Sequence, residues 1–205
     1  AAVVGGAQIL MHALQIDACY IVVESDKPEA LRSLAQALEK SGDERLSLKQ
    51  VPTIYPSGGE DQLVQLVTNR EVPSGGLPTD AGCVVQNVGT AAAVHDWIMN
   101  GEPLISRVTT VTGDGVVSPV NVRARIGTTV EAVIEAAGGY RGTPSHLVLG
   151  GPMTGKAVTT DAVPLVKSSN CILVLNEAPT AGDELPCGLP PSSLASPQSM
   201  TRTSP

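Results

Sequence analysis

Two short turns of this chain carry residue types that could hold a small ligand. In the first, Gly58 and Gly59 stand directly before Glu60 and a helix-like pattern. Glycines ahead of a helix let a ligand approach the backbone amides closely. Glu60 would then lie in the first helical turn, where its carboxylate either meets a sugar hydroxyl or only stabilises the helix dipole. Spacing alone favours the dipole role.

The second turn, residues 86–90, lies between a strand-like and a helix-like segment. Gln86 and Asn87 offer amide donors and acceptors, and Thr90 offers a hydroxyl. Turns that follow strands of one parallel sheet can meet over a single ligand at the carboxyl edge of that sheet. The sequence therefore allows one shared site, and spacing alone leaves its existence open.

A third glycine-rich segment, residues 150–156, resembles a phosphate-binding P-loop but departs from it. Ala157 stands where the loop needs a Ser or Thr hydroxyl for magnesium, and Pro152 removes a backbone donor. No helix-like pattern follows whose N-terminus could hold phosphate. We therefore predict a glycine-rich connection between two strands.

The residues that most often bind metals or act as nucleophiles are scattered. The three histidines are not grouped with cysteines or carboxylates at any metal-ligand spacing, and no Cys-x-x-Cys or Gly-x-Ser-x-Gly motif occurs. We predict no metal site, packed or solvated histidines, and structural thiols in a reducing compartment. The residues concerned are His12, His95, His146, Cys19, Cys83, Cys171 and Cys187.

Alternating apolar patterns predict an α/β first half and a β-rich second half. In the first half, strands are expected at residues 18–23, 46–54 and 82–85. Helices are expected at residues 1–14, around 63–67 and at 90–100, and a further helix is expected between its cap Asp26 and its last residue Gly42. Later strands are expected at 105–112, 120–126, 147–149 and 172–175, wrapped on one helix that Thr128 or Thr129 caps. This second set is typical of a β-grasp, and the Pro- and Ser-rich residues 178–205 are expected to be disordered.

Composition excludes two classes of partner. The 205 residues include 20 acidic and 13 basic ones, for a net charge of −7, and only 2% are aromatic. Nucleic-acid surfaces need basic residues, and single-strand binders also need stacking aromatics, so no nucleic acid is expected. The longest apolar stretches fall short of the roughly 20 residues that cross a bilayer, so no membrane-spanning segment is expected. The apolar residues 1–14 lack the positive charges of a signal peptide and are expected to form a buried helix.

Several segments together resemble the RnfC family, the C subunits of the Rnf electron transport complex, in order across about residues 1–187. That family is similar to the flavin-bearing, NADH-oxidising subunit of respiratory complex I. The resemblance implies a partial Rossmann-like flavin domain at residues 1–102 and a soluble-ligand-binding β-grasp (SLBB) domain at 103–177. The segments that carry it are residues 55–60, 69–78, 85–91, 107–113 and 150–153.

The resemblance also implies flavin mononucleotide (FMN) as a cofactor. In the complex I relative, FMN lies among a glycine-rich loop, a Gly-Glu loop and an Asn-Asn-Val-Glu-Thr turn. By this correspondence the FMN-binding candidates are Gly58, Gly59, Glu60, Gln86, Asn87 and Thr90, of which Asn87 and Thr90 fit best. Gln86 replaces the first Asn, and Gly89 replaces the Glu.

Two departures from the family pattern concern the ends of the chain. In the family, a first glycine-rich flavin loop and an acidic segment both come before the position that corresponds to Ala1. Cys187 resembles the start of the paired motifs that ligate two 4Fe-4S clusters, but no further cysteine follows it. Four ligands are needed for each cluster, so no cluster is expected in this chain. We expect a chain shortened at both ends, by truncation or frameshift, with little redox activity alone.

The implied function is electron transfer between NADH and ferredoxin-linked iron–sulfur partners through FMN, coupled by membrane subunits to ion transport. The expected partners are the other Rnf subunits, and the expected location is the cytoplasmic side of the bacterial inner membrane, without a membrane span. Two alternatives stay open. Residues 103–177 could act as a non-catalytic docking or ligand-binding module, or the chain could resemble the family's cobalamin-reductase relatives. Catalytic residues remain unknown.

Overall fold

A computed structural model describes residues 1–54, 57–151 and 155–176. The chain divides into two compact units, Ala1–Pro103 and the part from Leu104 onward. The sequence interpretations of Tyr55 and Pro56, of residues 152–154, and of the tail with Cys187 lie outside the described residues.

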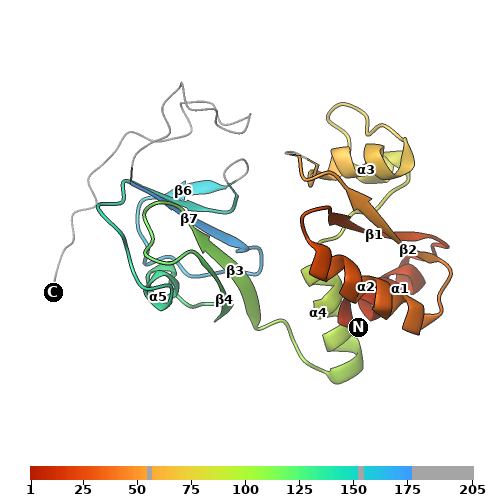
Figure 1. The fold of residues 1–205 in the computed structure, drawn as a ribbon, viewed down its shortest axis with the longest axis horizontal. Helices are drawn as coiled ribbons and strands as arrows, with labels where there is room; N and C mark the ends of the chain where they lie inside the picture. Colours follow the sequence, from red (N-terminus) through yellow and green to blue (C-terminus); the bar gives the residue numbers. More distant parts are fainter. Residues whose placement is uncertain (55–56, 152–154, 177–205) are drawn as a thin grey trace. The chain divides into compact units, whose positions relative to one another are not determined.

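The first unit combines helices with a small parallel sheet (Figure 1). Strands β1 and β2 pair in parallel, in register from Cys19 opposite Leu46 to Glu24 opposite Val51. A two-stranded sheet is marginal in water without packing partners, so the helices must supply most of the stability. The elements are α1 (Ala2–Leu14), β1 (Cys19–Glu24), α2 (Pro28–Ser41), β2 (Leu46–Val51), α3 (Glu60–Thr68), the 3₁₀ helix η1 (Pro78–Ala81) and α4 (Val88–Asn100).

The core of this unit lies between α1 and the sheet. Buried residues of α1 meet Ile21 of β1 and Leu46 of β2, while Leu34 and Leu38 of α2 pack against the same cluster. Helix α1 also packs closely on α4, because Gly6 faces the backbone of Ala91. A Cβ added to Gly6 would come within 1.8 Å of the Ala91 carbonyl oxygen. The buried α1 residues in this cluster are Val4, Ala7 and Met11.

The N-cap residue of helix α2 lies one position later than predicted. Pro28 takes the first helical position, and Gly42 ends the helix, as expected, in the left-handed region at φ 61°. Asp26 does not cap it, because Lys27 is the N-cap residue and forms no side-chain capping bond. The Asp26 amide instead donates to Thr53 Oγ1 at 3.2 Å, and its carboxylate pairs with Lys27.

The predicted strand at residues 82–85 is wrong. Gly82 adopts a left-handed φ of 71° and ends η1, and the following residues join no sheet. Val84 is 49% exposed. Among the described residues β1 and β2 pair only with each other, so residues 82–85 add no third strand to that sheet. An apolar run alone therefore did not decide this element.

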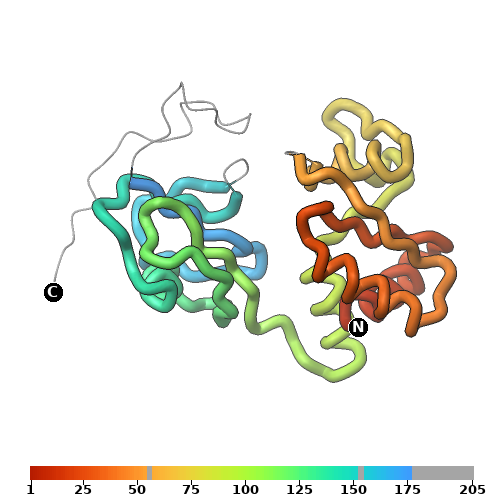
Figure 2. Tube along the Cα trace, viewed as in Figure 1, coloured from red at the N-terminus to blue at the C-terminus, as the bar shows by residue number. Residues whose placement is uncertain are grey.

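The second unit is a five-stranded mixed sheet with one helix, in the strand order β4-β3-β7-β5-β6 (Figures 1 and 2). Strands β3 and β7 are parallel, and the other pairs are antiparallel. This is the expected β-grasp-type arrangement following an α/β unit. Its elements are β3 (Ser106–Thr112), β4 (Val120–Arg125), α5 (Val130–Ala136), β5 (His146–Leu149), β6 (Lys156–Val158) and β7 (Cys171–Leu175).

A single apolar cluster fills the second unit. Helix α5 contributes Val130, Val133 and Ile134, and β7 contributes Ile172 and Val174, all at most 2% exposed. Of the two predicted caps, Thr129 is the one that caps α5, because its hydroxyl accepts a hydrogen bond from the Ala132 amide at 3.3 Å. The cluster closes around these residues without a large aromatic side chain in its buried set.

The P-loop-like segment is a connection between strands, as predicted. Strand β5 ends at Leu149 and β6 begins at Lys156, and the two pair antiparallel. The sequence did not predict β6 itself, because its three residues follow a glycine-rich run. Across the described ranges, no helix is both long and apolar enough to cross a membrane.

Candidate ligand-binding site

The first predicted turn forms the N-terminus of α3. Gly59 is the N-cap residue in an extended conformation, and no side chain caps the helix. The first bond of the helix runs from the Leu63 amide to the Gly59 carbonyl at 2.9 Å. The amides of Glu60, Asp61 and Gln62 precede it and have no acceptor among the described residues. They are donors available to a ligand.

The acidic residues at this turn select the kind of group that fits. Glu60 and Asp61 both lie in the first turn of α3, where carboxylates stabilise the positive end of the helix dipole. They also repel a phosphate and accept hydrogen bonds from hydroxyl groups. Gly58 leaves space here, because a Cβ added to it would meet nothing within 4 Å. The turn therefore suits a polyhydroxyl group better than an anion.

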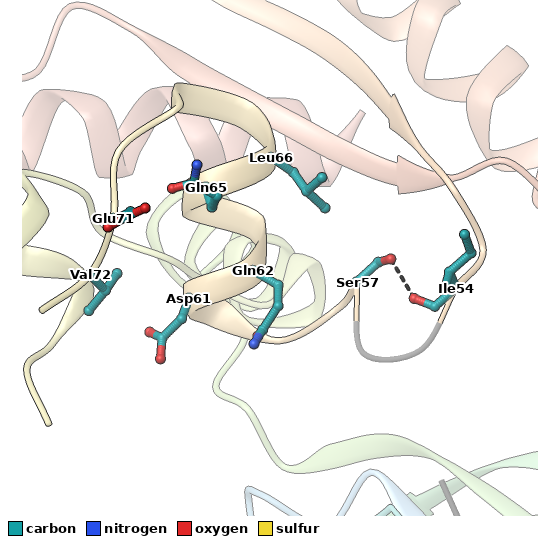
Figure 3. Close-up of a pocket in the computed structure, with 8 residues that line it drawn as sticks. All are labelled: Ile54, Ser57, Asp61, Gln62, Gln65, Leu66, Glu71 and Val72. Atoms are coloured by element: carbon teal, nitrogen blue, oxygen red, sulfur yellow. Dashed lines mark hydrogen bonds between the residues drawn. The ribbon is translucent and has the colours of Figure 1, made fainter. Parts of the chain in front are cut away.

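A shallow pocket of about 530 Å³ lies along α3, and the sequence did not predict it. Figure 3 shows side chains of α3 on one wall and Glu71 and Val72 of the following loop nearby. Ser57 Oγ donates a hydrogen bond to the Ile54 carbonyl at its other end. None of the six predicted FMN candidates lines it. The lining residues are Ile54, Ser57, Asp61, Gln62, Gln65, Leu66, Glu71 and Val72.

The second predicted turn forms the N-terminus of α4, and its own residues satisfy most of its amides. Asn87 is the N-cap residue, and its Oδ1 accepts from the Gly89 amide at 2.8 Å. The Asn87 carbonyl accepts from the amides of Thr90 and Ala91 at 2.9 and 3.1 Å. Capping of this kind stabilises a helix by about 1 kcal/mol. The Asn87 side chain therefore has a structural role.

Several donors remain at this second turn. The Asn87 side-chain NH₂ and the Thr90 hydroxyl have no hydrogen-bond partner within the part of the chain that the structure describes. Gln86 is exposed. These groups can donate to phosphate or carbonyl oxygens of a ligand. The α4 turn thus offers side-chain donors, whereas the α3 turn offers backbone amide donors together with carboxylate acceptors.

No hydrogen bond or ion pair between described residues joins the two turns. Gly58, Gly59 and Glu60 lie together at α3, and Gln86, Asn87 and Thr90 lie together at α4. A shared site across both turns therefore stays a prediction.

The described residues hold no group of three or more His, Cys, Asp or Glu side chains that could bind a metal ion. His95 Nδ1 lies 3.0 Å from Asp96 Oδ1, within one helix. Burial raises the pKa of the thiols of Cys19 and Cys171, which keeps them protonated and weakly reactive.

Comparison with known families assigns both units. The Nuo51 FMN-binding domain family matches residues 1–96, and the SLBB domain family matches residues 108–157. The C subunit of the ion-translocating oxidoreductase complex of Pseudomonas aeruginosa is 46% identical over 187 residues, which are 90% of this chain and 24% of that protein. This chain belongs to the RnfC family.

A second relative of this RnfC-family chain is the C subunit of the proton-translocating ferredoxin:NAD⁺ oxidoreductase complex of Clostridium ljungdahlii. It is 42% identical over 175 residues, covering 85% of this chain and 38% of that protein. The chain thus spans 24% of the length of the first relative and 38% of the length of the second.

The fold of the RnfC-family chain also occurs in a solved structure. An NAD⁺-reducing [NiFe]-hydrogenase in its H₂-reduced state matches 84% of this chain and 35% of the hydrogenase chain, with a TM-score of 0.67 and 19% identity. At this identity the match supports the fold alone. It agrees with the predicted α/β unit followed by a β-grasp unit.

Proposed function

We propose that residues 1–102 of this RnfC-family chain form part of an FMN site. The observation that carries this proposal is the match of the FMN-binding domain family to residues 1–96, a range that contains both candidate turns. When bound, FMN supplies the hydride and electron chemistry, and the protein binds and orients it.

The polar groups at the two turns suit the two ends of FMN. The free Asn87 NH₂ and Thr90 hydroxyl, close to the N-terminus of α4, match a phosphate or ring carbonyl. The carboxylates of Glu60 and Asp61 match the ribityl hydroxyls, and the space at Gly58 leaves room for them. These matches support FMN as the ligand and assign a separate role to each turn.

The complete protein, on this proposal, passes electrons between NADH and iron–sulfur partners in an ion-translocating complex. The C. ljungdahlii relative is named for ferredoxin and NAD⁺, which supports both as reaction partners. The other Rnf subunits would hold it at the cytoplasmic side of the bacterial inner membrane. The 4Fe-4S clusters of the family are not proposed for this chain.

A docking function for residues 103–177 is the second candidate. The unit from Leu104 onward has its own buried cluster and matches the SLBB domain family over residues 108–157. It can therefore fold around a core that contains no residue of the FMN candidate set. Copurification of a colourless chain with other Rnf subunits would favour this candidate.

The test is a titration of the chain with FMN, followed by flavin fluorescence, for wild type, Asn87→Ser and Asn87→Ala. Ser keeps an N-cap acceptor but lacks the amide donor, whereas Ala lacks both. We expect both variants to bind FMN about tenfold more weakly, which corresponds to one lost hydrogen bond to a charged group. Only Asn87→Ala should also lower the urea midpoint.

Wild-type affinity for both variants would show that the Asn87 amide does not contact flavin. No binding by wild type would contradict a usable FMN site in this chain and leave the family assignment intact. Riboflavin serves as a matched ligand, because it lacks the phosphate. Equal affinities for FMN and riboflavin would contradict the phosphate role of the α4 turn.

A further inference from the structure

The connection between the two candidate turns contains an arginine whose role the sequence did not reveal. Helix α3 begins at the first turn, and the chain then runs through residues 69–77 and η1 to the second turn at Asn87. Arg70 is the residue that joins the end of α3 to η1. Its Nη1 donates a hydrogen bond to the Ala81 carbonyl at 3.1 Å.

Arg70 is fixed at its own backbone by the last turn of α3. Asn69 ends that helix in the left-handed region at φ 56°. The Arg70 amide donates to Thr68 Oγ1 at 3.2 Å, and this hydroxyl donates to the Val64 carbonyl at 2.7 Å. The guanidinium therefore extends from a defined point on α3.

The far end of the contact is equally well defined. The Leu77 amide donates to Asp80 Oδ2 at 2.8 Å, and the Cys83 amide donates to the Pro78 carbonyl at 2.9 Å. Gly82 leaves room for the guanidinium, because a Cβ there would lie 3.0 Å from Arg70 Nη1. Segment η1 is thus held by its own hydrogen bonds, and the Arg70 guanidinium adds one further hydrogen bond to it from the end of α3.

Beyond Cys83 the chain has little support of its own. Residues 84–86 form no backbone hydrogen bond with any described residue before Asn87 caps α4. Helix α4 is held separately, by its close contact with α1 at Gly6. The path from η1 to Asn87 is therefore fixed at its start by the Arg70 contact and at its end by α4.

We propose that Arg70 is a positioning residue that holds the α4 turn at a set distance from the α3 turn. The inference rests on the proposed FMN site and adds a residue that need not touch the flavin. A guanidinium suits this task because its planar donors have a fixed direction, whereas a lysine ammonium is a mobile point charge. Loss of the contact should loosen residues 83–86 and leave both helices folded.

The experiment measures amide hydrogen exchange and FMN binding on the full chain for wild type, Arg70→Ala and Arg70→Lys. The matched control is Arg32→Ala, which removes another exposed arginine whose Nε donates to a backbone carbonyl, that of Pro28 at 3.4 Å. In Arg70→Ala we expect faster exchange at the Gly82 and Cys83 amides, which donate to the carbonyls of Thr79 and Pro78, unchanged exchange in α1 and α4, and about tenfold weaker FMN binding. Arg70→Lys should lie between, and Arg32→Ala should match wild type.

Three results would overturn the proposal. Unchanged exchange at the hydrogen-bonded amides of Gly82 and Cys83 in Arg70→Ala would show that Arg70 does not hold this segment. Faster exchange with wild-type FMN affinity would show that the segment's position does not matter for the flavin. A lower urea midpoint together with faster exchange throughout the first unit would also count against it, because the role would then be general stability. If wild type binds no FMN, the FMN site fails, while the exchange measurement still decides whether Arg70 holds the turn.

Discussion

The two units of this chain differ in charge and in core. Residues 1–103 include 13 acidic and 6 basic residues, whereas residues 104–176 include 4 acidic and 6 basic ones. The second unit surrounds one apolar cluster of eleven buried residues, and the first has a smaller cluster of five beside a two-stranded sheet. The candidate site is in the acidic unit with the smaller core. Binding groups and stability are thus supplied by different parts of the chain.

The largest expected effect comes from truncating a buried side chain in the larger core, that of the second unit. Ile172 is fully buried in the second unit, and Ile172→Ala should cost that unit about 2–5 kcal/mol. Trp97, the single tryptophan, belongs to α4 and reports on the first unit. The amides of the second unit should lose their protection from hydrogen exchange at a lower urea concentration than in wild type. The urea midpoint of the Trp97 fluorescence transition should not change.

The matched variant for this test is Ile21→Ala in the first unit, where Ile21 is 5% exposed. It should shift the Trp97 transition and leave exchange in the second unit unchanged. If either variant moved both transitions equally, the two cores would not be independent and the comparison would fail.

A smaller effect is expected from the contact between α1 and α4. Gly6→Ala would place a methyl group 1.8 Å from the Ala91 carbonyl oxygen, so the two helices must separate. Overpacking of this kind costs about 1–3 kcal/mol. Thermal unfolding followed by Trp97 fluorescence measures it.

Gly58→Ala is the control for that substitution, because a Cβ at Gly58 meets nothing within 4 Å. It should change the stability by less than about 0.5 kcal/mol. If Gly58→Ala lost as much stability as Gly6→Ala, the loss would reflect the replacement of any glycine by alanine, and the close contact between Gly6 and Ala91 would not explain it.

The first unit should also lose stability in acid through one carboxylate. Hydrogen bonds from Arg45 first, and then from Gln8, hold the pKa of Asp43 well below its usual range. A lowered folded-state pKa contributes stability that is present above the unfolded pKa of about 4 and is lost as the pH falls below it. In wild type, the urea midpoint of the Trp97 transition should fall as the pH is lowered from 5 to 2, and in Asp43→Asn it should fall less.

Glu44→Gln is a suitable control, since this neighbouring residue is exposed and forms no ion pair with any described residue. Its pH dependence should follow wild type. An Asp43→Asn profile that also followed wild type would show that the Arg45 contact does not persist in solution.

The smallest effect concerns salt. FMN is an anion, and the unit proposed to bind it has seven more acidic than basic residues. Salt screens this repulsion, because the Debye length falls from about 30 Å at 0.01 M to about 8 Å at 0.15 M. FMN affinity should rise by a few fold over that range, whereas riboflavin affinity should change less. A steep fall in FMN affinity with salt would instead indicate attraction by local basic groups.

Sequence patterns were sufficient where an element depends on its own residues. Gly42 and Thr129 mark helix ends that the structure confirms. They were insufficient where an element depends on a neighbour. Residues 82–85 form an apolar run but pair with no strand, and β6 is a strand only because β5 pairs with it.

The candidate site was predictable to a similar extent. The positions of Gly59 and Asn87 at helix starts follow from local patterns, and both are N-cap residues in the structure. The capping bond of Asn87 was not predicted, because an asparagine before a helix suits a ligand contact as well as a cap. The contact from Arg70 to Ala81 depends on how a loop folds back, which no periodic pattern encodes. Whether the two turns share one ligand stays a prediction.

The strand order of the second unit has a consequence for synthesis on the ribosome. Strand β7 lies in the middle of the sheet, between β3 and β5, yet it is the last strand of the described chain. Thr110 of β3 pairs with Cys171, so the earlier strands lack their central neighbour until that late segment has emerged. The first unit has all its described strands by Val51. Folding during translation should therefore begin well before the second sheet can close, and nascent chains that end before residue 171 should expose apolar strand edges to chaperones.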